Sequence, residues 1–126
     1  MSCRTILLVE DEALILMDIE AALIEEGFQV VTAMNGIRAS ETFEADPTRI
    51  DAVVTDISLG KGLNGWCLAR QIRQQMPEMP IVYMTGDSAH EWEAEGVPKS
   101  VVIPKPFVHA QVITALATLM NHSNQA

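Results

Sequence analysis

The sequence predicts a single α/β domain in which a parallel β-sheet lies between two layers of helices. Apolar runs alternate five times with segments whose apolar residues recur at helical spacing. Within the runs, apolar and polar residues do not alternate, which is typical of strands buried on both faces of a parallel sheet. A length of 126 residues with 48% hydrophobic residues suits one domain with a substantial core. The chain is therefore predicted to form a (βα)5 doubly wound domain.

In the first half of the chain, glycine or proline ends each helical segment. Ile15, Ile19 and Leu23 recur every four residues until Gly27, which is typical of the residue just after a helix. The second helical segment ends before Pro47, because the residue that precedes a proline avoids the helical conformation. In order, this half is predicted as strand 5–10, helix 15–26, strand 28–33, helix 36–43 and strand 50–55.

The second half continues the same alternation. Leu68, Ile72 and Met76 lie on one side of a helix that ends at Pro77, and a short acidic helix ends at Gly96. The predicted order is helix 65–75, strand 80–84, helix 88–95, strand 101–103 and helix 107–121. Residues 1–121 are expected to form the domain, and residues 122–126 a polar C-terminal tail.

Charge and composition limit the classes of partner. Eight basic and seventeen acidic residues give a formal charge of −9 and a pI near 4.6. This charge repels nucleic acid phosphates and anionic membrane surfaces, so we expect neither as a partner. No apolar run approaches the roughly 20 residues needed to cross a bilayer, and no secretory signal pattern is present, so a cytoplasmic location is expected. Cys3 and Cys67 lack metal or redox spacing and are expected to be reduced thiols.

Polar side chains follow the predicted strands at the ends where a parallel sheet opens. Right-handed crossovers place all strand-to-helix loops at one edge of the sheet, where doubly wound domains bind their ligands. The residues that this topology brings together are Glu10, Asp11, Asp56, Thr85 and Lys105.

These residue types together suit phosphoryl transfer. Crowded carboxylates resist ionisation unless a cation occupies their site, and oxygen ligands in an exposed cleft favour Mg²⁺. One carboxylate can also act as a nucleophile and form an acyl phosphate. The oxygens of the transferred group must be neutralised from several directions, which a cation, the Lys105 ammonium and the Thr85 hydroxyl would do. The sequence thus predicts a phosphoryl-transfer site with Mg²⁺ as its cofactor.

The motifs at four strand ends, taken in order, resemble the receiver domain of bacterial two-component response regulators. The resemblance covers nearly the whole chain and implies a flavodoxin-like fold with strand order 2-1-3-4-5. It also implies a phosphoacceptor that assists its own phosphorylation and dephosphorylation, rather than an enzyme. The motifs are Glu10-Asp11, Asp56, Thr85-Gly86 and Lys105-Pro106-Phe107.

By this resemblance, each residue at the acidic end of the site has a role. Asp56 would accept the phosphoryl group from a histidine kinase or a histidine phosphotransfer protein. Asp11, Asp56 and the backbone carbonyl of Ser58 would ligate Mg²⁺. Glu10 would act mainly through a metal-bound water.

The same resemblance gives roles to the residues around the phosphoryl group. Lys105 would form an ion pair with that group, and Thr85 would turn its hydroxyl toward it. The peptide bond before Pro106 is expected to be cis. Ser58 and Asp87 would flank the phosphate and tune its hydrolysis.

Two positions depart from the common receiver pattern. Gly65 follows the phosphoacceptor by nine residues, where receivers commonly have a glycine one residue earlier, so the intervening loop is longer. Val102 stands where receivers commonly carry an aromatic residue that turns inward on activation. We hypothesise that this readout is absent, moves to Tyr83 or Trp92, or is replaced by a reordering of residues 88–99 on phosphorylation.

The last predicted helix carries two apolar stripes. The second stripe is either part of a broad buried face or an exposed contact surface. Receivers frequently use the fourth helix, fifth strand and fifth helix as such a surface, for a homodimer or for a protein target. Since the sequence ends with this helix, we expect a stand-alone receiver that signals by noncovalent binding. The first stripe is Ile113, Leu116, Ala117 and Met120, and the second is Val108, Val112, Ala115 and Leu119.

Other interpretations stay open at this point. Each site residue alone has an ordinary explanation, such as an N-cap for Asp56 or a turn for Thr85. Within signalling, the alternatives are a phosphate sink and a degenerate receiver that binds partners without phosphorylation. An Asp-nucleophile phosphohydrolase would place a second acid where Ser58 stands. A flavin-binding domain would need a glycine- and hydroxyl-rich loop after the first strand, where this chain has acids.

Overall fold

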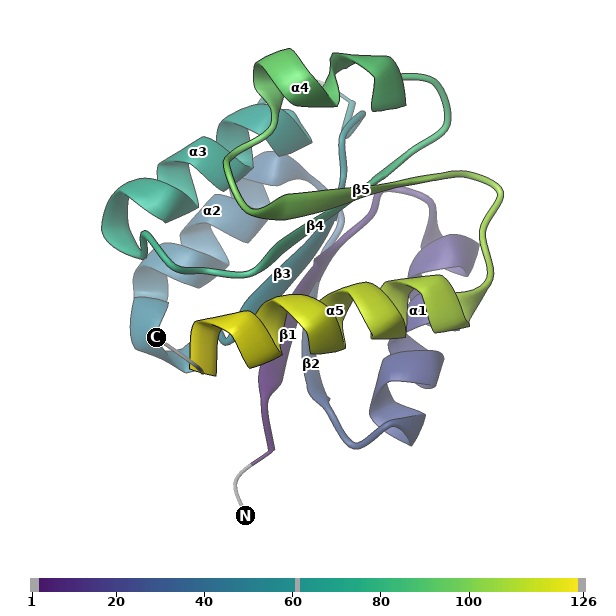
Figure 1. Ribbon diagram of the computed structural model, residues 1–126, viewed down its shortest axis with the longest axis vertical. Coiled ribbons are helices and arrows are strands. Elements are labelled where there is room, and N and C mark those ends of the chain that lie inside the picture. The colour runs from purple at the N-terminus through teal and green to yellow at the C-terminus, as the bar shows by residue number, and fades with distance from the viewer. Residues whose placement is uncertain (1–2, 61, 125–126) are drawn as a thin grey trace.

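The computed structural model describes residues 3–60 and 62–124. Five parallel strands form one sheet in the order β2-β1-β3-β4-β5, as predicted. Helices cover both faces of this sheet (Figure 1). The strands are β1 Thr5–Val9, β2 Gln29–Ala33, β3 Ala52–Asp56, β4 Ile81–Thr85 and β5 Ser100–Pro104.

The helices alternate with the strands, and two short 3₁₀-helices are added to them. The 3₁₀-helices are η1 Pro47–Arg49 and η2 Ala89–Glu91. The α-helices are α1 Ala13–Glu25, α2 Gly36–Ala45, α3 Gly65–Gln75, α4 Trp92–Glu95 and α5 His109–Asn124.

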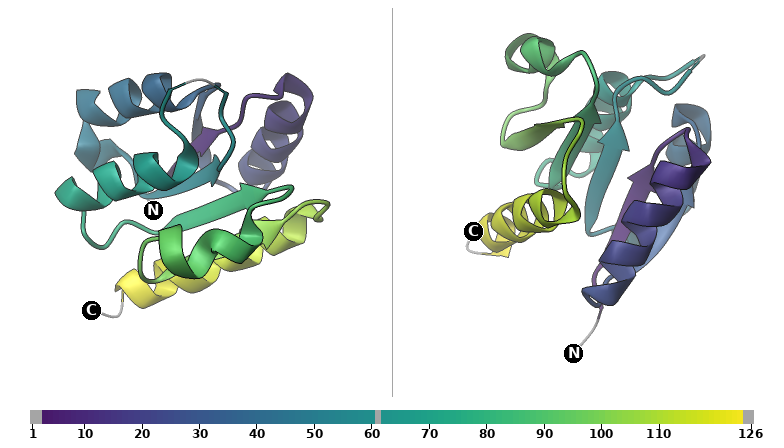
Figure 2. Two further views of the ribbon diagram at one scale, coloured as in Figure 1. Left: turned by 90° about the horizontal axis from the view of Figure 1, so that it is seen from above. Right: turned by 90° about the vertical axis from the view of Figure 1, so that its right-hand side faces the viewer.

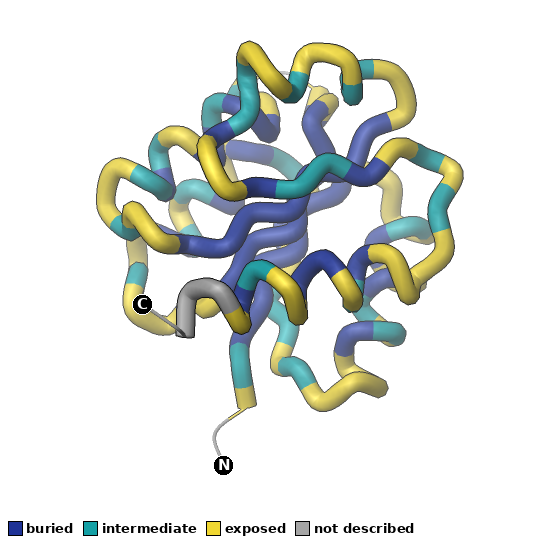
Figure 3. The backbone as a smooth tube through the Cα atoms, viewed as in Figure 1, coloured by how far each residue is buried: buried dark blue, intermediate teal, exposed yellow. Residues whose placement is uncertain are grey.

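Burial follows the strand order of the sheet. Every residue of the central strands β1, β3 and β4 is buried, whereas the edge strands β2 and β5 are partly exposed (Figure 3). This agrees with the prediction from the apolar runs, because only strands covered on both faces can be apolar at every position.

Two hydrophobic cores lie on opposite faces of the sheet. Figure 2 shows α1 and α5 on one side and α2 and α3 on the other. Successive strand residues point to opposite faces, so Leu7 and Val53 face the α2–α3 side while Leu8 and Val54 face the α1–α5 side. The helices are therefore held by alternate side chains of the same strands.

Polar caps fix where α2 and α3 begin. The Asn35 Oδ1 atom accepts a hydrogen bond from the Arg38 amide at 2.8 Å, and Asn64 Oδ1 accepts one from the Cys67 amide at 2.9 Å. At the other end of α1, Gly27 has φ +99°, a left-handed conformation that confirms its predicted position after the helix.

Some predicted boundaries differ from the structure. Glu10 lies just beyond β1, and η1 was not predicted because a proline after a helix signals only its end. The helix predicted over 88–95 is divided into η2 and a single turn, α4. The last helix continues to Asn124, beyond its predicted end, so part of the predicted tail is helical; residues 125–126 lie outside the described residues.

The interpretation of the second stripe on α5 as an exposed contact surface is wrong. Val112 is only 1% exposed, Ala115 is buried and Leu119 is half-buried. Val108, which is 63% exposed, is the one exposed member of the second stripe. In the first stripe, Ala117 is exposed. Residues from both stripes face the sheet, because the helix packs against it with a broad apolar face rather than with one narrow stripe.

Two smaller expectations concern membranes and cysteines. Among the described residues, no helix is both long enough and apolar enough to cross a bilayer. Cys3 and Cys67 are free thiols, as expected.

Candidate functional site

The ends of four strands bring the predicted site residues to one edge of the sheet. Asp56 and Thr85 are the last residues of β3 and β4, and Glu10 and Lys105 directly follow β1 and β5. Because all strands are parallel, these ends share the edge at which the chain passes into the helices. The topology therefore gathers residues that are up to 95 positions apart in the sequence.

Three carboxylates form a compact cluster there. Oxygen atoms of Glu10, Asp11 and Asp56 all lie within 4.8 Å of one another. Glu10 is fully buried and Asp56 is 6% exposed, whereas Asp11 faces solvent. Hard oxygen ligands with one open side fit Mg²⁺, which keeps several of its waters when bound. The donor set present in this chain therefore suits that ion.

Lys105 is the cation that the cluster faces. Its Nζ atom donates hydrogen bonds to Glu10 Oε1 at 3.1 Å and to Asp56 Oδ2 at 3.0 Å. Partial burial lowers the pKa of Lys105, but the bonds to Asp56 and Glu10 outweigh it and leave the pKa above its ordinary value. The ammonium is thus charged, and it bridges the two buried carboxylates.

Glu10 has the most perturbed acidity of the cluster. Burial raises its pKa to about 7, and the nearby negative charge of Asp56 adds to the rise. The Glu12 amide, which donates to Glu10 Oε2 at 3.1 Å, and the Lys105 ammonium act in the opposite direction. The Glu12 contact was not predicted, although a run of three acids at a strand end is the pattern that produces it.

Thr85 points its hydroxyl oxygen at the loop that follows β4. Thr85 Oγ1 accepts hydrogen bonds from the Asp87 amide at 3.2 Å and from the Ser88 amide at 2.8 Å. Its backbone carbonyl accepts a bond from the Lys105 amide, which ties β4 to the residue after β5. Thr85 therefore lies at the site, as predicted, and also organises the next turn.

The loop after β3 contributes one backbone contact to the site. The Ser58 amide donates to Asp56 Oδ1 at 3.3 Å, which helps to fix the carboxylate. The Ser58 carbonyl as a metal ligand stays a prediction. The peptide bond between Lys105 and Pro106 is cis, as the resemblance implies.

Gly65 allows α3 to approach the phosphoacceptor candidate closely. A Cβ atom at this position would lie 2.4 Å from the Asp56 backbone oxygen, so any larger residue would push α3 away from β3. The longer loop predicted between these residues ends at this contact.

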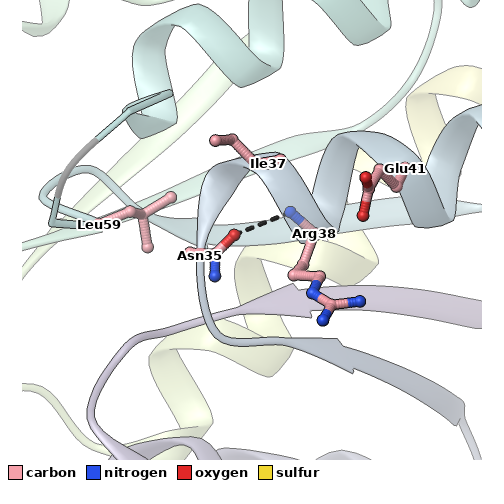
Figure 4. A pocket seen from close by; sticks show the side chains of 5 residues that line it. All are labelled: Asn35, Ile37, Arg38, Glu41 and Leu59. Atoms are coloured by element: carbon pink, nitrogen blue, oxygen red, sulfur yellow. Dashed lines mark hydrogen bonds between the residues drawn. The ribbon is translucent and has the colours of Figure 1, made fainter.

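A separate cavity of about 580 Å³ opens at the same edge of the sheet. It lies between the start of α2 and the loop after β3, and it is lined by none of the residues predicted for the site (Figure 4). Its Asn35 side chain is occupied in capping α2. The lining residues are Asn35, Ile37, Arg38, Glu41 and Leu59.

Comparison with solved structures gives close matches. A response regulator receiver protein from Sinorhizobium medicae is 43% identical, with a TM-score of 0.93, over 97% of this chain and 98% of that one. The receiver domain of sensor histidine kinase PA1611 from Pseudomonas aeruginosa is 28% identical, with a TM-score of 0.81, over 95% of this chain and 99% of that one. That domain has a magnesium ion coordinated in its active-site cleft.

Sequence comparison agrees with the structural one. The transcriptional regulatory protein QseB from Escherichia coli O157:H7 is 31% identical over 94% of this chain. The match covers 54% of QseB, and this chain spans only about half the length of most such relatives. Sensor kinase CckA from Brucella abortus is 31% identical over 92% of this chain and 12% of its own length. The family model described as the response regulator receiver domain matches residues 6–117, so the chain belongs to that family.

Proposed function

We propose that this receiver accepts a phosphoryl group on Asp56 from a histidine kinase or a histidine phosphotransfer protein, in a reaction that depends on Mg²⁺. The observation that carries the proposal is the position of Asp56. Its carboxylate is held by the Lys105 ammonium at 3.0 Å inside a cluster of three carboxylates, at the open edge of the sheet. A nucleophile and its charge-balancing groups are therefore already in place.

The transfer is a displacement at phosphorus. A carboxylate oxygen of Asp56 attacks, the O–P bond forms, and the P–N bond to the donor histidine breaks. Mg²⁺, held by Asp11 and Asp56 with Glu10 acting through a water, would neutralise oxygens of the phosphoryl group.

Two side chains of the protein complete this charge balance. Lys105 moves from its bond with Asp56 Oδ2 to the phosphoryl group, and Thr85 turns its hydroxyl to donate to a phosphoryl oxygen. Thr85 ends the strand beside β3, and the Lys105 side chain already reaches Asp56 from the residue after β5, so neither motion needs a change in the sheet.

The surface next to the site suits docking of a phosphodonor protein. Leu14 and Met17 on α1 are 80% and 61% exposed, and Val108 is similarly exposed at the start of α5. These residues belong to the two segments that flank a cavity of about 290 Å³, which Lys105 and Phe107 help to line. Exposed apolar area beside a reactive group is typical of a protein contact surface.

A second surface is proposed for a target protein. A shallow cavity of about 490 Å³ lies between β5 and α5, and its lining includes Val101, Val102, Ala110 and Thr114. This face replaces the second stripe of α5 as the candidate contact area, because most of that stripe is buried. A homodimer, a stand-alone arrangement and a cytoplasmic location stay predictions.

Incubation with acetyl phosphate and Mg²⁺, followed by intact mass measurement, tests the proposal. The wild type is expected to gain about 80 Da, the mass of one phosphoryl group replacing one proton. Asp56→Asn should show no gain, and chelation of the metal should abolish the gain in the wild type. Asp51→Asn is the matched control, because Asp51 bonds the Thr5 amide at the opposite edge of the sheet. An unmodified wild type, or a modified Asp56→Asn variant, would contradict the proposal.

A further inference from the structure

The segment between β4 and β5, residues 86–99, has little regular structure of its own. It contains only η2 and the single turn of α4, each held by few helical hydrogen bonds. Short helices of this kind are not stable alone, so the position of the segment depends on contacts with its surroundings. These contacts come from side chains of β4, β5 and α3.

Tyr83 of β4 holds the C-terminal end of the segment. Its phenol oxygen accepts a hydrogen bond from the Val97 amide at 3.1 Å. The side chain is fully buried, and its ring centroid lies 4.6 Å from that of Trp66 with the planes tilted by 58°. The ring is thus fixed by packing, and its hydroxyl is a rigid anchor for the segment.

Trp92 and Ser100 tie α4 to the start of β5. The Trp92 indole N–H donates to Ser100 Oγ at 2.9 Å, and Ser100 Oγ in turn donates to the Val97 carbonyl at 2.6 Å. A Cβ atom on Gly96 would lie 2.4 Å from the Trp92 ring, so the indole crosses the backbone directly over this glycine. We call the connected set of Tyr83, Trp92, Val97 and Ser100 the Trp92 latch.

Two arginines of α3 hold the same segment from outside. Arg70 donates to both the carboxylate and the backbone carbonyl of Glu95. Arg73 donates to the Pro98 and Lys99 carbonyls at 2.7 and 3.2 Å. These bonds keep the end of the segment close to α3, while the latch holds it to the sheet.

The N-terminal end of the segment is held by the phosphoacceptor site itself. Thr85 Oγ1 is the acceptor for the Asp87 and Ser88 amides, and Thr85 lies two residues after Tyr83 on the same strand. If the Thr85 hydroxyl turns toward a phosphoryl group on Asp56, both amides lose their acceptor. Rotation of the Thr85 side chain would thereby release the N-terminal end of the segment, which lies opposite to the end held by the latch.

We propose that the Trp92 latch is the conformational readout of this receiver: it is closed when Asp56 is free, and it opens when Thr85 turns toward a phosphoryl group. This inference rests on the proposed function. Val102 packs against the same core as Trp92 but has no polar side-chain atom, so it cannot take part in the hydrogen-bonded chain. Ser100 and Trp92 supply this connection, and opening exposes both the indole and the Val97 amide.

Hydrogen exchange at the tryptophan indoles tests the latch. The chain has two tryptophans, so the ¹⁵N spectrum has two indole N–H signals, and Trp92→Phe assigns them. Addition of beryllofluoride and Mg²⁺ should speed exchange of the Trp92 indole and the Val97 amide by about two- to tenfold, the factor that corresponds to losing one net hydrogen bond. The buried Trp66 indole serves as an internal reference and should change little.

Two variants test the same contacts without phosphorylation. Ser100→Ala removes the acceptor of the Trp92 indole, so the indole should exchange in the free protein as fast as in the activated wild type. Tyr83→Phe removes the acceptor of the Val97 amide but keeps the packed ring, and should speed exchange of that amide. Both variants should still gain the mass of a phosphoryl group. Ser40→Ala is the matched control, because it removes a bond from Gln71 between α2 and α3.

The outcomes separate the latch from the proposed function. If beryllofluoride binds, seen as a shift of the Ser58 amide signal, while Trp92 exchange stays unchanged, the latch is refuted and the phosphoacceptor role stands. If Ser100→Ala leaves Trp92 exchange at the rate of the free wild type, the latch is also refuted. If neither beryllofluoride nor acetyl phosphate modifies Asp56, the proposed function fails and the coupling fails with it.

Discussion

The Lys105 ammonium lies 3.0 Å from the Asp56 carboxylate, and it reaches across from the residue after β5 to the last residue of β3. The same nitrogen contacts Glu10, so one ammonium bridges two buried carboxyl groups. A phosphoryl group on Asp56 would meet this ammonium without further rearrangement of the backbone. The pair would therefore serve both the stability of the free protein and the charge balance of the proposed transfer.

Replacement of Lys105 by Met should separate these two effects. In the absence of Mg²⁺, the variant leaves the buried carboxylates without their ammonium and should lower the free energy of unfolding by about 1–3 kcal/mol. Mg²⁺ should restore part of this loss, because it supplies a replacement charge. Urea unfolding with and without Mg²⁺ measures both quantities. Arg38→Met is the control: it changes an exposed side chain away from the cluster and should leave the free energy of unfolding nearly unchanged. If Lys105→Met is as stable as the wild type without metal, Lys105 does not bridge the carboxylates.

Glu10→Gln should change how stability depends on pH. The pKa of Glu10 is raised from 4.5 to about 7 in the folded protein, so the folded state binds this proton more tightly than the unfolded state. The contribution of protonated Glu10 to the free energy of unfolding is therefore fully present below pH 4.5, and it is lost as the pH rises toward and through 7.

The difference between Glu10→Gln and the wild type isolates this contribution. Without metal, the variant should gain stability relative to the wild type between pH 5 and pH 8, by an amount on the order of 2 kcal/mol. Urea unfolding across that range measures it. Parallel pH profiles for the two proteins would show that Glu10 titrates normally.

The position of the site could be predicted from the sequence because one rule of topology fixes it. Once the apolar runs are parallel strands, Asp56 and Thr85 must end at the same edge, whatever the details of packing. The contact between Lys105 and Glu10 could not be predicted, because it depends on side-chain conformations of residues that are far apart in the sequence.

Helix α5 and the segment before β5 show why other features were missed. Both stripes of α5 are equally apolar, and periodicity alone cannot tell whether one or both face the sheet. Burial of Val112 together with Leu116 shows that both do. The segment around α4 is held by contacts from Tyr83, Arg73 and Ser100 rather than by its own propensity. When tertiary contacts rather than helix propensity hold a segment in place, its own residues do not predict its conformation.

Gly65→Ala should disturb the site through the backbone. Its Cβ would lie 2.4 Å from the Asp56 carbonyl oxygen, so β3 and α3 must separate, at a cost of about 1–3 kcal/mol in unfolding free energy. Displacement of Asp56 should also slow phosphorylation by acetyl phosphate. Gly86→Ala is the matched control, because a Cβ there meets no atom within 4 Å and the backbone is not left-handed. Equal melting temperatures for the two variants would show that the close approach is not needed.

A pair of aspartate substitutions can distinguish a buried member of the second stripe of α5 from its exposed member. Val112→Asp buries a carboxylate in the core between α5 and the sheet, where Val112 packs with Leu116 and Met84, and should lower the free energy of unfolding by more than about 3 kcal/mol. Val108→Asp places the same charge at a position that is 63% exposed, so it should leave stability nearly unchanged. Thermal unfolding compares the two directly. If Val112→Asp is as stable as Val108→Asp, Val112 is not buried against the sheet. If Val108→Asp weakens phosphotransfer from a donor protein while acetyl phosphate still modifies Asp56, Val108 belongs to the surface that binds the donor.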